Sequence, residues 1–211
     1  MKRQKPSLAE ERLLRKQGYR HIAGVDEVGR GALVGPVLAA AVILPEKFKS
    51  GWRSGVRESK QLLPEVREYL YDYIKETAVS IGIGSSSSED IDAYGIAKAT
   101  RLAMIKAIEQ LDPSPQFLLI DYLTLTETKL PQKGIKFGDS LCFSIACASI
   151  IAKVTRDRLM VEIDRTYPGY GFAEHKGYGT VSHLKCLREK GPCPLHRRSF
   201  RPVSELAGFR P

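Results

Sequence analysis

The fold is decided by the stretch His21-Ile-Ala-Gly-Val-Asp-Glu-Val-Gly-Arg-Gly-Ala-Leu-Val-Gly-Pro-Val-Leu-Ala-Ala-Ala-Val-Ile-Leu44. Two apolar runs in it, residues 21–25 and 37–44, predict two short strands. A glycine-rich segment separates the runs, which favours a hairpin. We therefore expect this hairpin to begin a β-sheet.

The rest of the chain alternates predicted helices and strands. Helical spacing and cap signals predict helices at residues 7–18, 64–77, 89–111, 140–167 and 180–190. Ser7 is the predicted N-cap of the first helix. Apolar runs predict strands at residues 79–84 and 117–120. Strands followed by alternating helices and strands are typical of an α/β fold with a mixed sheet flanked by helices.

The charge is unevenly distributed along the 211 residues. The chain has 33 Lys and Arg against 24 Asp and Glu, a net charge of +9. Residues 1–20 hold seven basic and two acidic side chains, and residues 175–211 hold eight and two, so the ends carry +5 and +6 and the middle −2. Basic ends indicate either solvated termini or a grip on a polyanion. A hydrophobic share of 43% excludes a disordered polyelectrolyte.

No targeting or membrane segment is predicted, because no run of 18 apolar residues exists and the basic start is not followed by an apolar stretch. A cytoplasmic location with reduced cysteines is expected. A zinc site is a minor alternative for Cys186, Cys193, His183 and His196. The glycine-rich turn does not match a dinucleotide-binding pattern, since its third glycine comes one position late and a strand follows it.

Four acidic residues stand where predicted strands end or a buried helix begins. Asp26 and Glu27 follow the first strand, Asp121 follows residues 117–120, and Asp139 precedes the apolar helix. A buried acid needs a partner, and four acids brought together would repel one another unless divalent cations lay between them. Carboxylate oxygens suit Mg²⁺ or Mn²⁺. Taken singly each acid is explained as a cap, turn or surface residue, with Asp139 a candidate N-cap, so the hypothesis depends on the set.

Two such ions would support hydrolysis of a phosphodiester. One would activate a water for in-line attack on phosphorus, and the other would stabilise the leaving oxygen. A basic chain suits a nucleic-acid substrate. Composition and spacing alone thus indicate a metal-dependent nuclease, with a non-catalytic nucleic-acid-binding module as the alternative from another class.

Seven motifs in order resemble those of ribonuclease HII of the bacterial type, over roughly residues 20–204. They are Gly24-Val-Asp-Glu-Val-Gly-Arg-Gly31, Glu58-Ser-Lys-Gln-Leu62, Leu119-Ile-Asp121, Gly138-Asp-Ser140, Ala148-Ser-Ile-Ile-Ala-Lys-Val-Thr-Arg-Asp157, His175-Lys-Gly-Tyr-Gly-Thr180 and His196-Arg-Arg-Ser-Phe200. Departures from the family pattern include Ala32, where proline is usual, and Glu58, where aspartate is usual.

The resemblance implies an RNase H-like fold with a helical C-terminal extension. It divides the chain into a basic N-terminal helical extension at residues 1–20, a catalytic domain at 21–170 and a C-terminal substrate-binding helical segment at 171–211. For the N-terminal extension we expect a solvated helix, and for the C-terminal segment contact with substrate. A monomer is expected, and residues 203–211 hold no convincing clamp-binding motif.

The resemblance also assigns roles to residues. The catalytic and metal-binding acids would be Asp26, Glu27, Asp121 and Asp139. Expected substrate contacts are Gly29, Arg30 and Gly31 at a ribose 2′-OH, Tyr178 against the deoxyribose after the junction, and Ser59 and Lys60, with Lys60 at a phosphate. Only the 2′-OH distinguishes RNA from DNA at such a site.

The activity implied is cleavage of the RNA strand of RNA–DNA hybrids and of the 5′ side of ribonucleotides embedded in duplex DNA, as in ribonucleotide removal during replication and repair. The products would carry 3′-hydroxyl and 5′-phosphate ends, and two Mg²⁺ or Mn²⁺ ions would be the cofactors. A different two-metal nuclease or a hybrid-only ribonuclease would also use the four acids, but would leave the Gly29-Arg30-Gly31 turn and Tyr178 without a role.

Overall fold

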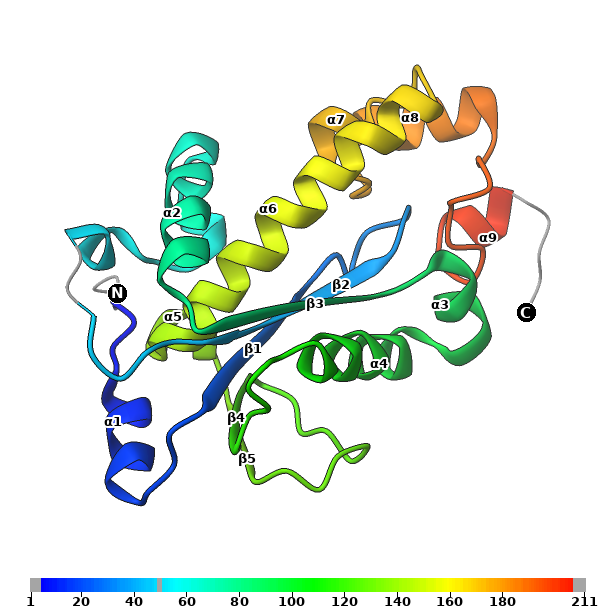
Figure 1. The fold of residues 1–211 in the computed structure, drawn as a ribbon. Coiled ribbons are helices and arrows are strands. Elements are labelled where there is room, and N and C mark those ends of the chain that lie inside the picture. Colours follow the sequence, from blue (N-terminus) through cyan, green and yellow to red (C-terminus); the bar gives the residue numbers. More distant parts are fainter. Residues whose placement is uncertain (1–4, 49–50, 207–211) are drawn as a thin grey trace.

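The predicted hairpin forms the centre of a five-stranded mixed sheet (Figure 1). The computed structural model describes residues 5–48 and 51–206. The strands are β1 (Ile22–Val28), β2 (Val37–Ile43), β3 (Ser80–Ser86), β4 (Phe117–Asp121) and β5 (Gln132–Ile135), in the spatial order β3-β2-β1-β4-β5. β1, β2 and β3 pair antiparallel, whereas β4 pairs parallel to β1 and β5 parallel to β4. The fold is the RNase H-like α/β fold that the sequence predicts.

Helices cover both faces of the sheet. In chain order they are α1 (Ala9–Lys16), α2 (Pro64–Thr77), α3 (Ser88–Tyr94), α4 (Ile96–Glu109), α5 (Gly138–Leu141), α6 (Phe143–Thr166), α7 (Phe172–His175), α8 (Val181–Lys190) and α9 (Val203–Leu206). Figure 1 shows α2 and α6 on one side of the sheet and α4 on the other. Two short 3₁₀ turns, Gly51–Gly55 and Ser59–Gln61, precede α2. Within the described residues, no helix is both long and apolar enough to cross a membrane.

Strand β2 is buried on both faces, as its unbroken apolar run predicts. Leu38, Ala40 and Val42 pack with residues of α2 and α6, and the alternate residues pack with α4. Side chains alternate between faces along a strand, so both helical layers rest on this one strand. Its three consecutive alanines, residues 39–41, leave room for helices on both sides.

Gly24 allows α6 to lie directly on β1. A Cβ atom built at Gly24 would lie only 2.2 Å from the carbonyl carbon of Ser144, in the first turn of α6. No side chain fits in that space. The contact brings the start of the longest described helix next to Asp26, two residues further along the strand.

We expect Gly24→Ala to destabilise the fold by roughly 1–3 kcal/mol or more, because the methyl group forces α6 away from β1. Urea or guanidinium unfolding monitored by circular dichroism would measure the change. Gly51→Ala is the matched control, since a Cβ there meets no atom within 4 Å. An equal effect of the two substitutions would contradict the close contact.

Two of the predicted helices are each divided in two. The helix expected over residues 89–111 is broken at Gly95, whose φ of 79° lies in the left-handed region that glycine adopts easily. The helix expected over residues 140–167 is broken at Cys142, which has an extended backbone. The prediction of single helices was wrong in both places, whereas α2 begins and ends where its pattern predicts.

The second break lies where Ser7, just before α1, pairs with the chain. Ser7 pairs with Cys142 in a parallel bridge, accepting from the Phe143 N–H and donating to the Leu141 carbonyl at 3.0 Å each. The prediction that Ser7 is the N-cap of α1 was therefore wrong. Leu8 occupies that position, and its side chain makes no capping hydrogen bond. Glu11, 1% exposed, accepts from the Ser144 N–H at 2.8 Å. The helix is packed on the body through its acidic and apolar side.

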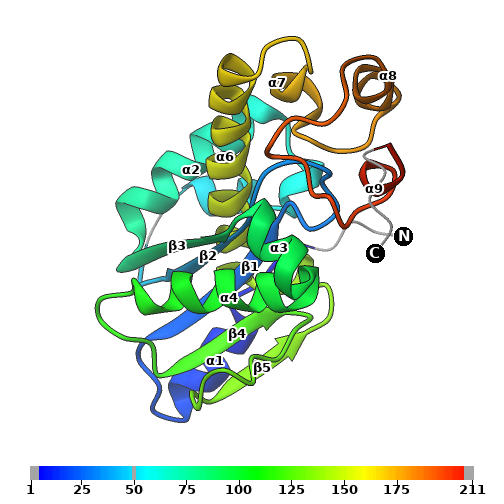
Figure 2. The same cartoon turned by 90° about the vertical axis from the view of Figure 1, so that its right-hand side faces the viewer.

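The C-terminal segment packs against the far end of α6 and the turn after β1. Figure 2 shows α7, α8 and α9 gathered there. A separate apolar cluster joins this segment to Leu33, Val34 and Met160. Arg197 is fully buried and donates to the carbonyls of Gly29, Arg30 and Gly35 at 2.7, 2.8 and 3.0 Å. A buried guanidinium therefore fixes the glycine-rich turn from behind.

Candidate active site

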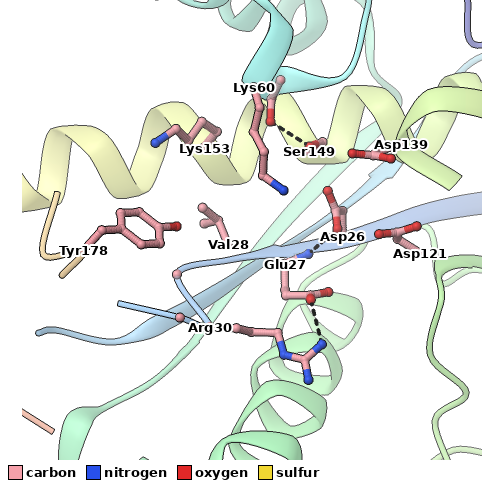
Figure 3. Close-up of a pocket in the computed structure, with 13 residues that line it drawn as sticks. Asp26, Glu27, Val28, Arg30, Lys60, Asp121, Asp139, Ser149, Lys153 and Tyr178 are labelled. Atoms are coloured by element: carbon pink, nitrogen blue, oxygen red, sulfur yellow. Dashed lines mark hydrogen bonds and ion pairs between the residues drawn. The ribbon is translucent and has the colours of Figure 1, made fainter. Parts of the chain in front are cut away.

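A pocket of about 440 Å³ opens where β1 and β4 end beneath α6 (Figure 3). All ten residues singled out from the sequence line it: Asp26, Glu27, Gly29, Arg30, Gly31, Ser59, Lys60, Asp121, Asp139 and Tyr178. Three further lining residues, Val28, Ser149 and Lys153, were not predicted. The sequence motifs thus converge on one cavity from five separate parts of the chain.

Neighbouring strands and a short helix bring the acids together. β1 continues through the acids to Val28, so the expectation that the strand ends at Val25 was wrong, and Asp26 and Glu27 leave opposite faces. Asp121 ends the adjacent parallel strand. Its Oδ1 accepts from the Gly138 N–H at 2.7 Å, which places α5 and Asp139 beside it. Figure 3 shows Asp26, Asp121 and Asp139 close together, with Glu27 turned toward Arg30.

The carboxyl groups raise one another's pKa values. Burial raises the pKa of Asp26 well above its usual range, and Glu27, Asp121 and Asp139 add to this. Burial also raises the pKa of Asp121. Burial and then the charge of Asp121 raise the pKa of Asp139 to about 6. Burial also raises the pKa of Glu27, although the nearby Arg30 charge opposes that rise. The cluster is a concentration of negative charge that calls for a cation.

The donor set fits a hard divalent cation. All four groups offer oxygen, which Mg²⁺ and Mn²⁺ prefer. Glu27 Oε2 is buried and has no hydrogen-bond partner. As the side chains lie, no three His, Cys, Asp or Glu residues within 5–48 and 51–206 are arranged to hold a metal ion. Glu27 accounts for part of this, because its Oε1 lies 3.3 Å from Arg30 Nη1. The four acids surround one space, and side-chain rotation would be needed for them to share an ion.

The raised pKa values predict an inverse dependence of stability on pH in metal-free protein. A carboxyl group with a folded-state pKa above its unfolded value binds protons more readily when folded, so stability falls as the pH rises, between about 4 and 6 for Asp139. Asp139→Asn should raise the melting temperature of metal-free protein at pH 7 and flatten its fall over that range. Mn²⁺ should stabilise the wild type more than the variant. Differential scanning fluorimetry measures both, and a lower melting temperature of the metal-free variant would contradict the repulsion.

Ser149 links two parts of the pocket through its hydroxyl. The Oγ atoms of Ser59 and Ser149 are 2.9 Å apart, and Ser59 is only 4% exposed. Ser149 also opposes the rise in the pKa of Asp26 by hydrogen bonding to it. Ser59 thus holds the Ser-Lys turn against α6 and leaves Lys60 exposed beside the acids, where its charge lowers the pKa values of Asp121 and Asp139.

A sequence signal for Ser149 existed. The first half of α6 is buried all round, and a hydroxyl in such a helix requires a hydrogen-bond partner. Lys153 follows one helical turn later on the same side, which brings its side chain into the pocket. Its ammonium donates to Asp157 at 2.7 Å.

The glycine turn before β2 needs its glycine. Gly29 has φ 87°, and a Cβ there would lie 2.2 Å from Arg156 Nε. Arg156 is fully buried and donates to the carbonyls of Lys176 and Val34 at 2.9 and 3.2 Å. Two buried arginines, Arg156 and Arg197, therefore fasten the turn to the C-terminal segment. Its own Arg30 stays partly exposed on the rim of the pocket.

Tyr178 is held in place by a chain of neutral histidines. Its carbonyl accepts from His183 Nδ1 at 2.9 Å, so His183 Nε2 has no proton in the neutral ring. His196 Nδ1 accepts from the Cys193 N–H at 2.9 Å, so the proton of His196 is on Nε2, 3.3 Å from His183 Nε2. Burial lowers the pKa of His183 and lowers that of His196 to about 4, which keeps both rings neutral.

These hydrogen bonds leave no free imidazole lone pair for a metal. The zinc site considered for Cys186, Cys193, His183 and His196 is therefore not supported: the ring nitrogens of both histidines are used within the chain. The pair instead positions the Tyr178 backbone, while Ala32 pairs with it in an antiparallel bridge. The Arg156 guanidinium lies 5.6 Å from the centre of the tyrosine ring.

Comparison with known proteins identifies the family of the chain. The family model for Ribonuclease HII matches residues 23–203. The chain belongs to the ribonuclease HII family. The ribonuclease HII of Dehalococcoides mccartyi (strain ATCC BAA-2266 / KCTC 15142 / 195) is 58% identical over 201 residues, covering 95% of each chain. That of Desulfitobacterium hafniense (strain DSM 10664 / DCB-2) is 54% identical over 94% of this chain and 75% of its own.

Solved structures share the fold. The ribonuclease H2 of Pyrococcus horikoshii OT3 matches with a TM-score of 0.75 and 25% identity over 90% of this chain and 98% of that one. The RNase HII of Archaeoglobus fulgidus, solved in a complex with PCNA, matches with a TM-score of 0.72 and 25% identity over 88% and 96%. Membership of the ribonuclease HII family makes the chain a type II ribonuclease H, a hydrolase and endonuclease that acts on RNA–DNA. The family depends on divalent metal.

Proposed function

We propose that this ribonuclease HII cleaves both the RNA strand of RNA–DNA hybrids and the 5′ side of single ribonucleotides embedded in duplex DNA. The observation that carries the proposal is one pocket in which the four-acid cluster adjoins the Gly29-Arg30-Gly31 turn and Tyr178. The acids supply the chemistry, and the turn and the tyrosine supply the choice of sugar. The products carry 3′-hydroxyl and 5′-phosphate ends, and the working state is a monomer in the cytoplasm.

Asp26, Glu27, Asp121 and Asp139 are the residues that would hold two divalent ions, Mg²⁺ or Mn²⁺. When bound, the ions lower the pKa of an attacking water and stabilise the charge on the leaving oxygen. Asp121 accepts from the Gly138 N–H and Asp26 from the Glu27 N–H, each at 2.7 Å, so both carboxylates keep their direction. Glu27 would offer a cation its Oε2, which is buried and has no hydrogen-bond partner, while its Oε1 lies 3.3 Å from Arg30 Nη1.

The substrate side of the pocket reads the sugar. The glycine turn, fastened by Arg197 and Arg156, brings backbone groups and Arg30 to the 2′-OH next to the scissile phosphate. The Tyr178 ring packs on the following deoxyribose, where a further 2′-OH would not fit. Lys60 and Lys153 lie on the α6 side of the acids and neutralise phosphate charge (Figure 3).

Asp26→Asn should lower cleavage by about a hundredfold or more, because the loss of a carboxylate that holds a metal exceeds the 10–100-fold effect of its supporting residues. The measurement is cleavage of a duplex with one embedded ribonucleotide, beside a uniform hybrid, with Mg²⁺, with Mn²⁺ and with chelator. Mapping of the product ends tests the cleavage position. Near wild-type activity of the variant would rule out the four-acid scheme, and activity in chelator would rule out the ions.

Tyr178→Ala should change selectivity more than rate. We expect it to lower kcat/KM for the single-ribonucleotide duplex roughly tenfold relative to the uniform hybrid, while binding of the hybrid stays measurable, and Arg30→Ala should also blur the choice of junction. Tyr178→Phe, which keeps the ring, should restore the preference. An unchanged ratio between the two substrates in both alanine variants would show that another element reads the junction.

A further inference from the structure

Tyr122 directly follows Asp121 in a strained backbone conformation. Its φ is 60°, and the Leu123 N–H donates to the Asp121 carbonyl at 2.6 Å, which closes a turn of three residues around it. Glycine or asparagine adopts positive φ more readily than a bulky aromatic residue. The chain nevertheless has a tyrosine there, and that tyrosine is 66% exposed.

Phe137 shows the same combination on the other side of the acids. It precedes Gly138 and Asp139, has φ 59° and is also 66% exposed. The Lys136 ammonium lies 5.4 Å from the centre of its ring. Apart from Lys176, these two are the non-glycine residues with positive φ in the described parts of the chain. Each of the two is adjacent to, or one residue removed from, an acid of the pocket.

The two aromatic residues do not line the pocket themselves, but they are chain neighbours of Asp121 and Gly138, next to two of its acids. The Tyr122 N–H donates to the Ile135 carbonyl at 3.0 Å, so the ends of β4 and β5 place Tyr122 near the segment that leads into Phe137. In Figure 3 Asp121 and Asp139 lie at the end of the pocket away from Tyr178. The chain positions of Tyr122 and Phe137 therefore lie next to the acids at the end away from Tyr178.

The backbone conformation alone does not explain these side chains. The backbone next to Asp121 and Asp139 has positive φ at positions 122 and 137. Glycine or asparagine at these positions would adopt that φ with less strain and would expose less apolar surface. Strained residues persist where the surrounding structure uses them. Exposed rings beside a lysine and a phosphodiester-cleaving pocket are suited to the sugars and phosphates of a nucleic-acid strand.

We propose that Tyr122 and Phe137 form an aromatic contact for the substrate strand on the 5′ side of the scissile phosphate. Their rings pack on the sugar faces of the nucleotides there, and Lys136 lies beside the phosphates. The assignment of the 5′ side rests on the proposed function, in which Tyr178 contacts the nucleotide on the 3′ side. The strand then crosses the acids between two aromatic contacts, which fixes the phosphate at the metal-binding carboxylates.

The test uses asparagine, which relieves the strain and removes the ring. Tyr122→Asn and Phe137→Asn should leave the melting temperature equal to or above that of the wild type, because positive φ suits asparagine better. Each should raise KM for a duplex with one ribonucleotide about three- to tenfold with little change in kcat. Tyr122→Phe and Phe137→Tyr keep the ring and should recover most of the loss. Tyr69→Gln is the control, since Tyr69 is an exposed aromatic residue on α2, a helix that contributes no residue to the pocket.

Duplexes shortened on one side test the direction. The defect of the asparagine variants should disappear on a duplex that ends close to the ribonucleotide on its 5′ side and persist on one that ends close on its 3′ side. An unchanged KM on the full duplex, an equal defect on both shortened duplexes, or a fall in melting temperature parallel to the loss of activity would overturn the proposal. Failure of the wild type to cleave any ribonucleotide-containing duplex would instead overturn the proposed function.

Discussion

Four carboxyl groups that repel one another are held at one end of the sheet, and the rest of the structure keeps them there. Asp26 is 5% exposed, and its pKa is raised first by burial and then by the neighbouring acids. A free chain would separate such groups. Here Asp121 and Asp26 are each fixed by a backbone N–H, and Glu27 by Arg30. A divalent cation between the carboxyl groups would remove this repulsion, which is why the proposed function assigns the cluster to metal binding.

Both ends of the chain brace this cluster. At the N-terminal end, Ser7 and Glu11 bind the segment 141–144, just after Asp139, through backbone hydrogen bonds. At the C-terminal end, Arg197 holds the glycine turn that follows Glu27. The helix α6 joins the two, since it starts on β1 at Gly24 and ends among the C-terminal helices. Loss of either brace would move an acid or the glycine turn without removing any of the four carboxyl groups.

The sequence predicts most of the site but less of the fold around it. Strand periodicity and the motifs found β1, β2, β3 and β4, and all ten predicted residues line the pocket. β5 was missed because Gln132–Ile135 is a polar edge strand without an apolar run. The break at Cys142 was missed because it depends on Ser7, 135 positions earlier in the chain. Sequence patterns indicate the local conformational preference of each residue, whereas the break at Cys142 depends on a residue far away in the sequence.

The two helices that were predicted as one show the same limit in another way. Gly95 is an isolated glycine in a helical pattern, and a helix tolerates such a glycine at a cost of about 1 kcal/mol, so its presence alone does not predict a break. The strained Tyr122 and Phe137 had no signal at all, because neither residue type indicates positive φ. Ser149 could have been found, since a hydroxyl in a helix buried all round requires a partner.

Part of the net positive charge at the two ends lies on arginines that bind backbone carbonyls. The basic C-terminal end suggested a grip on phosphates, but its Arg197 is fully buried and donates only to backbone carbonyls among the hydrogen bonds of the described chain. At the N-terminal end, Arg15 donates to the carbonyls of Leu44, Pro45 and Glu46 in the same way. A guanidinium has five N–H donors, so it can hydrogen-bond to several backbone carbonyls of an irregular turn at once. Part of the positive surplus therefore fixes the loops, and the cations that face the pocket, Arg30, Lys60 and Lys153, come from the nearly neutral middle of the chain.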